Sequence, residues 1–222
     1  MVERDHMKTF LATVAVLMAL AACARGAELP APADAAADET EAQPAAGDDG
    51  TPAERIARWR AVLDSAVAKH DLAGVLTAID EIIKLDPQSY QNYIAKVSVL
   101  RLKGDLAGIL ATRRKAAEAL AGSATGLNEL AWDLVTEEKL ELRDPGLALK
   151  CAEESVRLSK RKDAAALDTL ARAWYELGMV EKAVELQKES LAAASNADER
   201  TQIKEALEYY EAVLKARAET LK

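Results

Sequence analysis

The hexapeptide DLAGVL at residues 71–76 returns as DLAGIL at residues 105–110, which begins 34 residues further along the chain. Around both copies the apolar residues recur with the three- and four-residue spacing of an amphipathic helix. A helical unit that returns at this period indicates a stack of repeats. One short helix pair cannot bury its apolar face alone and needs neighbours on which to pack.

The composition also favours helices packed on helices. Half of the 222 residues are hydrophobic but only 4% are aromatic, and Pro and Gly are sparse after residue 52, which disfavours an all-β fold. The net charge of -8 argues against a nucleic-acid partner, since phosphate binding requires clustered Lys and Arg. We interpret the basic clusters at residues 113–115 and 160–162 as solvated faces, the second at a helix end where cations complement the helix dipole.

The period divides the folded part into helix–turn–helix repeats. We expect one domain over residues 51–222, with a capping helix over residues 197–221 whose start is marked by Asn196 and Glu199. Its apolar face is formed by Ile203, Leu207, Tyr210 and Leu214. The predicted fold is all-α, a right-handed solenoid of about four repeats. The predicted repeats cover residues 56–89, 90–123, 124–163 and 164–197, and the third is lengthened around residues 137–143.

The repeats resemble the tetratricopeptide-repeat family. The fourth repeat reads Leu167-x₂-Leu170-Ala171-x₂-Trp174, followed by Ala183 in its second helix. The small residues allow two helices to approach closely, while the large ones fill the space beside them. At the turns, Gly104 and Gly178 permit a backbone conformation that other residues resist, and His70 holds the equivalent place in the first repeat.

A narrower resemblance covers residues 124–215. It is carried by four short stretches: LNELAW at 127–132, RDP at 143–145, LDTLAR at 167–172 and EKAVELQK at 181–188. These are similar to the helical C-terminal region that follows the thioredoxin-fold domain of bacterial redoxin proteins. The chain has neither that domain nor a CxxC motif, so the resemblance implies the helical module without the redox activity.

The N-terminal region has the pattern of an export signal. Residues 10–20 form an apolar run with the length of a signal-peptide core, too short for the roughly 20 residues that span a bilayer. Leu20-Ala21-Ala22-Cys23 at its end resembles the lipobox of bacterial lipoproteins. The resemblance implies that residues 1–22 are removed and that the Cys23 thiol receives a diacylglycerol. The alternative is ordinary cleavage, because Ala22-Cys23-Ala24 also fits a small-x-small site.

The segment between this motif and the repeats has the composition of a flexible tether. Residues 23–50 are rich in Ala, Pro, Asp and Glu, and Leu29 is their one large apolar side chain, so they cannot bury enough surface to offset the entropy of ordering. Such a tether has a typical reach of roughly 30 Å. The expected location is the cell envelope, with the outer membrane slightly favoured because Ala24 follows the lipobox cysteine. Whether translation starts at Met1 or Met7 stays open.

The residues offer little catalytic chemistry. The chain has two cysteines and two histidines, and it has no Gly-rich phosphate loop and no zinc-ligand spacing. We interpret His70 as a surface residue and Cys151 as a small apolar residue within a helix, with a mixed-disulfide role as the alternative for Cys151. Carboxylate pairs such as Glu137–Glu138 are assigned to solvent because adjacent helical residues point apart. The sequence therefore predicts no enzyme, no cofactor and no metal.

The predicted working surface is a concave groove. In the tetratricopeptide-repeat family, the first helix of each repeat lines that face. Carrying its positions over gives Arg60, Asp64, Gln91, Ile94, Ser98, Arg101, Asn128, Trp132, Asp168, Arg172 and Tyr175. The strongest candidate cluster is Asn128, Trp132, Asp168 and Arg172, since Trp and Arg dominate binding energetics. The alternative places Trp132 in the core and makes Asp168–Arg172 a surface pair.

These observations predict a membrane-anchored scaffold or adaptor of the bacterial cell envelope that binds a protein or peptide in its groove. The expected partner is an unknown protein or peptide, and the membrane is contacted through the lipid alone. We expect no nucleic acid and no small-molecule substrate. Two alternatives remain: an accessory protein of thiol-redox or redoxin pathways, suggested by the resemblance and Cys151, and a structural envelope lipoprotein.

The lipid anchor is directly testable. Replacement of Cys23 by Ser removes the thiol that would carry the diacylglycerol, so the variant should leave the membrane fraction or stay unprocessed. Mass spectrometry of the wild-type protein should show a lipid-modified Cys23 at the new N-terminus. An unmodified N-terminus at or near this residue would contradict the lipoprotein interpretation.

Overall fold

The structure is a computed structural model, and it describes residues 50–220. The predicted signal segment, Cys23 and almost all of the tether lie outside the described residues. Every regular element of residues 50–220 is a helix, which confirms the all-α prediction, and none of these helices has the length and apolarity needed to cross a membrane. In chain order the elements are α2 (Pro52–Ala68), α3 (Leu72–Leu85), α4 (Tyr90–Lys103), α5 (Leu106–Ala119), α6 (Ala124–Thr136), the 3₁₀ helix η1 (Leu140–Leu142), α7 (Pro145–Leu158), α8 (Ala164–Glu176), α9 (Val180–Ala193) and α10 (Ala197–Thr220).

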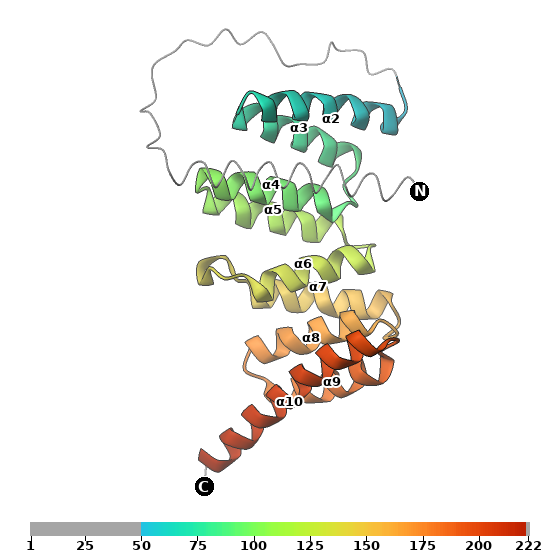
Figure 1. Ribbon diagram of the computed structural model, residues 1–222, viewed down its shortest axis with the longest axis vertical. Helices are drawn as coiled ribbons and strands as arrows, with labels where there is room; N and C mark the ends of the chain where they lie inside the picture. The colour runs from blue at the N-terminus through green and yellow to red at the C-terminus, as the bar shows by residue number, and fades with distance from the viewer. Residues whose placement is uncertain (1–49, 221–222) are drawn as a thin grey trace. The chain divides into compact units, whose positions relative to one another are not determined.

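The helices follow one another as short antiparallel pairs, which are visible along the chain in Figure 1. The chain divides into two compact units that meet within α5, between Thr112 and Arg113. In the first unit α2 packs on α3, and α3 packs on α4. In the second unit α6 packs on α7, α8 packs on both α7 and α9, and α10 packs on α9. In both units, helices that follow one another in the chain pack against each other.

Side-chain caps start the helices where the sequence changes from turn to apolar pattern. Thr51 and Glu54 form a complete capping box at α2, with Pro52 in its first turn. Asp71 accepts hydrogen bonds from the second and third backbone N–H groups of α3, and Asp163 does the same at α8. Each such bond satisfies an N–H that has no partner within the helix, which fixes the helix start.

The turns inside the repeats use left-handed backbone conformations. Gly104 and Gly178 have φ values of 70° and 81°, and His70, at the equivalent turn of the first repeat, has φ 57°. The sequence assigned these three positions the same role. Histidine carries a Cβ and adopts this conformation at a cost, whereas glycine adopts it freely.

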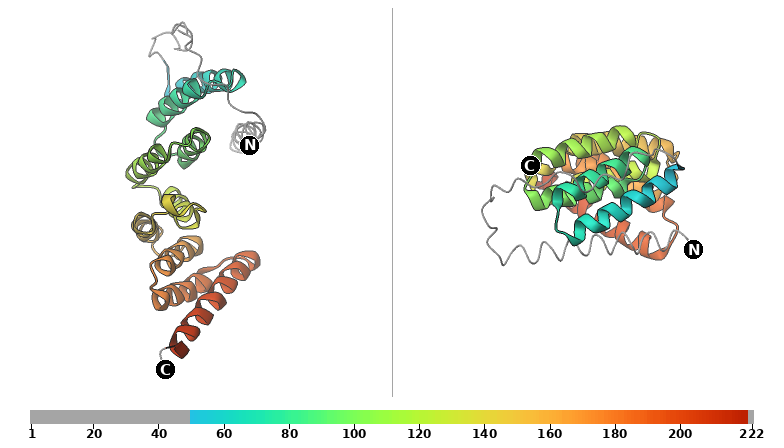
Figure 2. Two further views of the ribbon diagram at one scale, coloured as in Figure 1. Left: turned by 90° about the vertical axis from the view of Figure 1, so that its left-hand side faces the viewer. Right: turned by 90° about the horizontal axis from the view of Figure 1, so that it is seen from above.

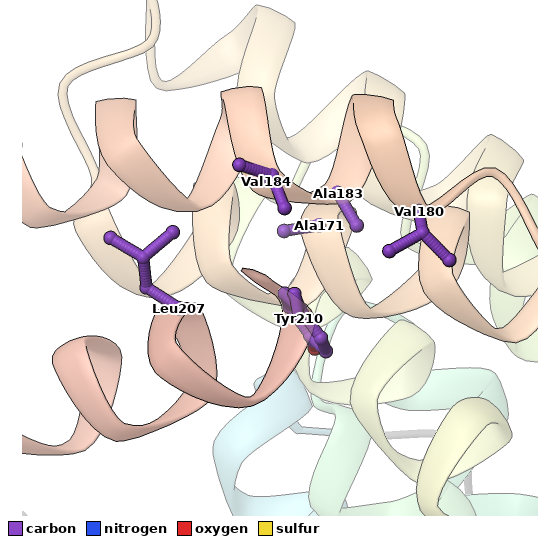
Figure 3. Close-up of a cluster of buried hydrophobic side chains, with 6 residues drawn as sticks. All are labelled: Ala171, Val180, Ala183, Val184, Leu207 and Tyr210. Carbon is purple, nitrogen blue, oxygen red and sulfur yellow. The ribbon is translucent and has the colours of Figure 1, made fainter. Parts of the chain in front are cut away.

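The core of the second unit shows why small residues recur in the pattern. Ala171 of α8 and Ala183 of α9 are fully buried and belong to one cluster with Val180, Leu207 and Tyr210 (Figure 3). A methyl group on each helix lets the two backbones come close, and the larger side chains close the remaining space. The cluster is the physical contact that the repeat pattern predicted.

The last helix covers the end of the stack. Ile203, Leu207 and Tyr210 of α10 are buried, and Leu214 is half-buried against the same core, as the helical pattern predicted. Asn196 caps the helix by accepting the Glu199 backbone N–H at 2.9 Å, while the Glu199 carboxylate accepts from Ser195. The C-terminal part of α10 continues beyond its contact with α9 (Figures 1 and 2).

The α8–α9 contact generates a stability prediction. Ala171→Leu adds three carbon atoms where no space is left, so overpacking should lower the free energy of unfolding by about 1–3 kcal/mol. The matched control is Ala192→Leu, because Ala192 lies on α9 with its side chain exposed. Thermal and urea unfolding should separate the two variants. Equal stability of both would mean that the repeat register is wrong.

Candidate functional site

The candidate site lies on the first helices of the third and fourth repeats, within the second unit. Asn128 and Trp132 are the fifth and ninth residues of α6, and Asp168 and Arg172 hold the same places on α8. Within each helix the two residues are one turn apart and share a face. Because α6 also packs directly on α8, the structure brings the two pairs onto neighbouring helices.

Trp132 is a surface residue. It is 42% exposed, so the alternative that placed it in the core is wrong. Its backbone carbonyl accepts the Thr136 hydroxyl at 2.7 Å, a local bond that leaves the indole ring uninvolved. A large aromatic side chain that stays in water in a protein with few aromatics is a candidate anchor for a partner.

Arg172 is held by acidic Glu176, one turn further along α8. The Arg172 Nε and Nη2 atoms lie 2.9 and 2.6 Å from Glu176 Oε1, and the Arg143 Nη1 atom lies 3.4 Å from Glu176 Oε2. The carboxylate is therefore shared by two guanidinium groups, one from α8 and one from the loop before α7. A side chain fixed in this way loses less entropy when it binds a partner.

Asp168 turns inward rather than toward Arg172, so the alternative of an Asp168–Arg172 surface pair is wrong. Its Oδ1 atom accepts the Gln187 Nε2 group at 2.5 Å, and the same Gln187 nitrogen donates to the Ile203 carbonyl at 3.1 Å. Burial raises the pKa of Asp168, against the opposing effects of the Gln187 hydrogen bond and the Arg172 charge. Asp168 thus bonds to Gln187 of α9, which in turn bonds to α10, so Asp168 has a structural role.

An aromatic group continues the surface toward α10. The Tyr175 and Tyr209 hydroxyls are 2.8 Å apart, the Tyr175 ring stacks on Tyr210 at 4.7 Å, and the Arg172 guanidinium lies 5.8 Å from the Tyr175 ring centre. Tyr209 is 54% exposed, while burial raises the pKa of Tyr210 to about 12. Tyr175 was predicted from the sequence as a site residue, whereas Tyr209 was not. The 34-residue spacing between these two tyrosines equals the repeat period and could have identified Tyr209.

Asn128 contributes a polar atom that its surroundings leave unsatisfied. Its Oδ1 atom is buried and has no hydrogen-bond partner among residues 50–220. An unpaired buried acceptor is costly to the folded state. Together with Trp132, Arg172, Tyr175 and Tyr209, Asn128 forms what we call the aromatic–arginine strip.

The remaining predicted site residues lie on α2 and α4, in the first unit. Arg60 and Asp64 are exposed on α2, Gln91 and Arg101 are exposed on α4, and Ile94 is half-buried. Ser98, also on α4, donates its hydroxyl to the Ile94 carbonyl at 2.9 Å. The helices α2 and α4 are joined through α3, which packs on both. That these residues form a binding face stays a prediction.

A buried ion pair builds the loop that carries Arg143. The Arg113 Nη2 and Glu137 Oε2 atoms are 2.7 Å apart, with side chains 5% and 4% exposed, and Arg113 Nη1 donates to the Leu142 carbonyl at 2.8 Å. Arg143 Nε donates to the Glu137 carbonyl at 2.5 Å. The assignment of Arg113 and Glu137 to solvent was therefore wrong. The residues that follow them, Arg114 and Glu138, are exposed, and local sequence could not show that a residue of α5 meets the end of α6.

Cys151 lies inside the second unit. It is 4% exposed, and burial, followed by the charge of Asp144, raises the pKa of its thiol to about 11. The thiolate is the reactive form of cysteine, so this environment suppresses reactivity at neutral pH. The structural interpretation of Cys151 is confirmed. Within the described range, no group of three or more His, Cys, Asp or Glu side chains is arranged to hold a metal ion.

Comparison with known proteins does not assign the chain to a family. No family model and no curated protein matches the chain. A solved structure of MamA is 16% identical, covering 73% of this chain and 92% of that one, with a TM-score of 0.44. MamA from Desulfovibrio magneticus RS-1 is 14% identical over 73% of this chain and 97% of that one, at 0.44. A chain of the APC/C hetero-tetramer Cut9-Hcn1 is 17% identical over 74% of this chain and 31% of that one, at 0.45.

At these TM-scores the likeness carries no functional argument. The assignment of a helical-repeat fold rests on the chain's own helix pairs, their 34-residue spacing and the buried small residues between them.

The buried ion pair generates the next prediction. Glu137→Gln removes the charge and leaves the Arg113 guanidinium buried without a counter-ion, which should lower the free energy of unfolding by about 3 kcal/mol. Glu138→Gln is the matched control, because Glu138 is exposed, and it should change stability by less than about 0.5 kcal/mol. Urea unfolding measures both. A neutral Glu137→Gln variant would show that the pair does not hold the loop.

Proposed function

We propose that this protein is a membrane-anchored scaffold that binds a protein or peptide through the aromatic–arginine strip of its second unit. The observation that carries the proposal is the exposure of Trp132 and Tyr209, at 42% and 54%, beside an Arg172 that is already fixed in place. Aromatic and arginine side chains supply most of the binding energy in protein interfaces.

The strip has the physical properties of a binding surface. Its apolar rings offer area to bury, and each Tyr hydroxyl also offers a polar contact. The Arg172 guanidinium, even while it shares Glu176, keeps further N–H donors that a backbone carbonyl or carboxylate of a partner can use. A peptide laid across α6 and α8 would meet both the aromatic rings and the guanidinium.

The strip is also rigid. Trp132 lies in the last turns of α6, while Arg172 and Tyr175 lie in the last turns of α8, so these anchors sit on helices rather than on loops. Preformed anchors raise affinity because little ordering remains to be done on binding.

The membrane-anchored part of the proposal rests on the sequence. Leu20-Ala21-Ala22-Cys23 supports lipidation of Cys23, and the acidic tether that follows would let the helical part stand away from the bilayer. An envelope location, with the outer membrane slightly favoured, follows from the same motif.

Two other functions were open at the sequence level. An accessory role in thiol-redox chemistry draws no support from Cys151, since its thiol is buried and its pKa is raised to about 11. A purely structural lipoprotein would need no exposed anchor residues, so the exposure of Trp132 and Tyr209 favours the scaffold over it.

A photo-crosslinking amino acid at position 132 tests the proposal. In cells it should join the chain to one partner protein, which mass spectrometry identifies. The same amino acid at position 204 is the control, because Lys204 is exposed on α10. If positions 132 and 204 gave the same set of weak crosslinked products, the result would favour a structural role.

The partner then permits a quantitative prediction. Trp132→Ala combined with Arg172→Ala should weaken its binding by about thirtyfold or more, which corresponds to about 2 kcal/mol. Isothermal titration measures the affinity, and circular dichroism checks the helix content. Unchanged affinity in a folded double variant would place the interface elsewhere. Loss of helicity would make Trp132 a packing residue and would remove the main support of the strip.

A further inference from the structure

The polar groups that the aromatic–arginine strip presents to a ligand include three hydrogen-bond donors. The Trp132 indole N–H, which can only donate, has no hydrogen-bond partner within residues 50–220. Arg172 keeps N–H groups beyond those that bind Glu176. In the hydroxyl pair of Tyr175 and Tyr209, one hydrogen joins the two oxygens and the other stays available.

The carboxylate and amide acceptors beside these donors are engaged, turned inward or buried. Each oxygen of Glu176 is held by a guanidinium, Oε1 by Arg172 and Oε2 by Arg143. Asp168 turns inward and bonds to α9, and the Asn128 Oδ1 atom is buried. The helices also satisfy most of their own backbone groups. A ligand that matches the strip therefore brings free acceptors and few donors of its own.

This excess of donors selects among the conformations that a bound peptide can take. An α-helix uses its carbonyls in its own hydrogen bonds. An extended strand presents N–H groups as well as carbonyls, so its N–H groups would lack acceptors on the strip. A polyproline II helix has no internal hydrogen bonds, and each proline lacks the N–H but keeps the carbonyl. It is the conformation that brings acceptors without matching donors.

The spacing of the helices fits the same conformation. Because α8 packs on α6 and Tyr175 of α8 meets Tyr209 of α10, the anchors lie on three successive helices. Packed helices are about 8–10 Å apart. A polyproline II helix, with three residues per turn, repeats the same face about every 9 Å. Side chains three residues apart on one face would therefore meet α6, α8 and α10 in turn, over about seven residues.

We propose that the strip binds a proline-rich segment of a partner protein in the polyproline II conformation. Its prolines would lie on the rings of Trp132 and Tyr209, which are 42% and 54% exposed, and its carbonyls would accept from Trp132 and Arg172. Such segments dock on aromatic surfaces because their preformed backbone loses little entropy on binding. The proposal rests on the strip being the binding surface, and it names the kind of segment that the strip takes.

Fluorescence anisotropy with the full chain in detergent tests this binding. The probe is a fluorescein-labelled peptide of three Pro-Pro-Ala triplets, which should bind saturably. The matched control is the same peptide made of D-amino acids, which keeps the composition and the carbonyls but reverses the left-handed helix. A second control is residues 24–49 of this chain, whose prolines at 30, 32 and 44 are never three residues apart. Both controls should bind at least about tenfold more weakly.

A conservative substitution separates the hydrogen bond from the aromatic ring. Trp132→Phe keeps an aromatic face but removes the indole N–H, so the affinity for the probe should fall by about threefold to tenfold. Trp59→Phe makes the same change on α2, in the first unit, and should leave the affinity within about twofold. Circular dichroism should show the same helix content in both variants and the wild type, because an aromatic ring is retained at each position.

The crosslink at position 132 distinguishes this inference from the proposed function. Mass spectrometry should place the crosslinked residue of the partner in a proline-rich segment. One partner joined through a segment without proline would overturn the inference and leave the strip as a binding surface. Equal binding of either control peptide, or unchanged affinity of Trp132→Phe, would also overturn the inference alone. The same weak products at positions 132 and 204, without binding of the probe, would overturn both.

Discussion

The close contact between paired helices, made through small residues, is the interaction on which the rest of this structure depends. Ala171 and Ala183 are fully buried between α8 and α9, and α10 covers the same cluster with Leu207 and Tyr210. A single helix of this length is marginal in water, because its stability comes from packing of its apolar face. The contact therefore fixes α8 and α9 against each other and, with them, the direction in which Arg172 leaves the surface.

Polar contacts fix the positions of loops and of charged side chains, which the apolar contacts do not. Arg113 and Glu137 pair in the interior and hold the loop that delivers Arg143 to Glu176. Glu176 in turn orients Arg172. Buried charge is expensive to desolvate, so this chain of contacts is better explained by the geometry that it imposes than by a net gain in stability. The strip on α6 and α8 thus depends on a loop that the Arg113–Glu137 pair holds in place.

Much of the fold could be predicted from the sequence, because its causes are local. The 34-residue return of DLAG, the caps at Thr51 and Asp71, and the turn positions of Gly104 and Gly178 are each visible within one repeat. The candidate site was predicted in part. The register placed Trp132 and Arg172 at equivalent positions of neighbouring helices. The sequence also suggested that Arg172 pairs with Asp168, but Asp168 instead accepts a hydrogen bond from Gln187.

What the sequence by itself determined is the all-α repeat, its period and the turns at which helices begin and end. Those properties follow from spacing along the chain, since caps act within a turn and amphipathicity within a helix. Only the tertiary structure decided that Arg113 meets Glu137, that Tyr209 joins Tyr175, and that Lys182 lies over the Trp174 ring. These contacts join residues from different helices. Which residues become neighbours depends on how the helices pack, and a local sequence pattern does not encode that packing.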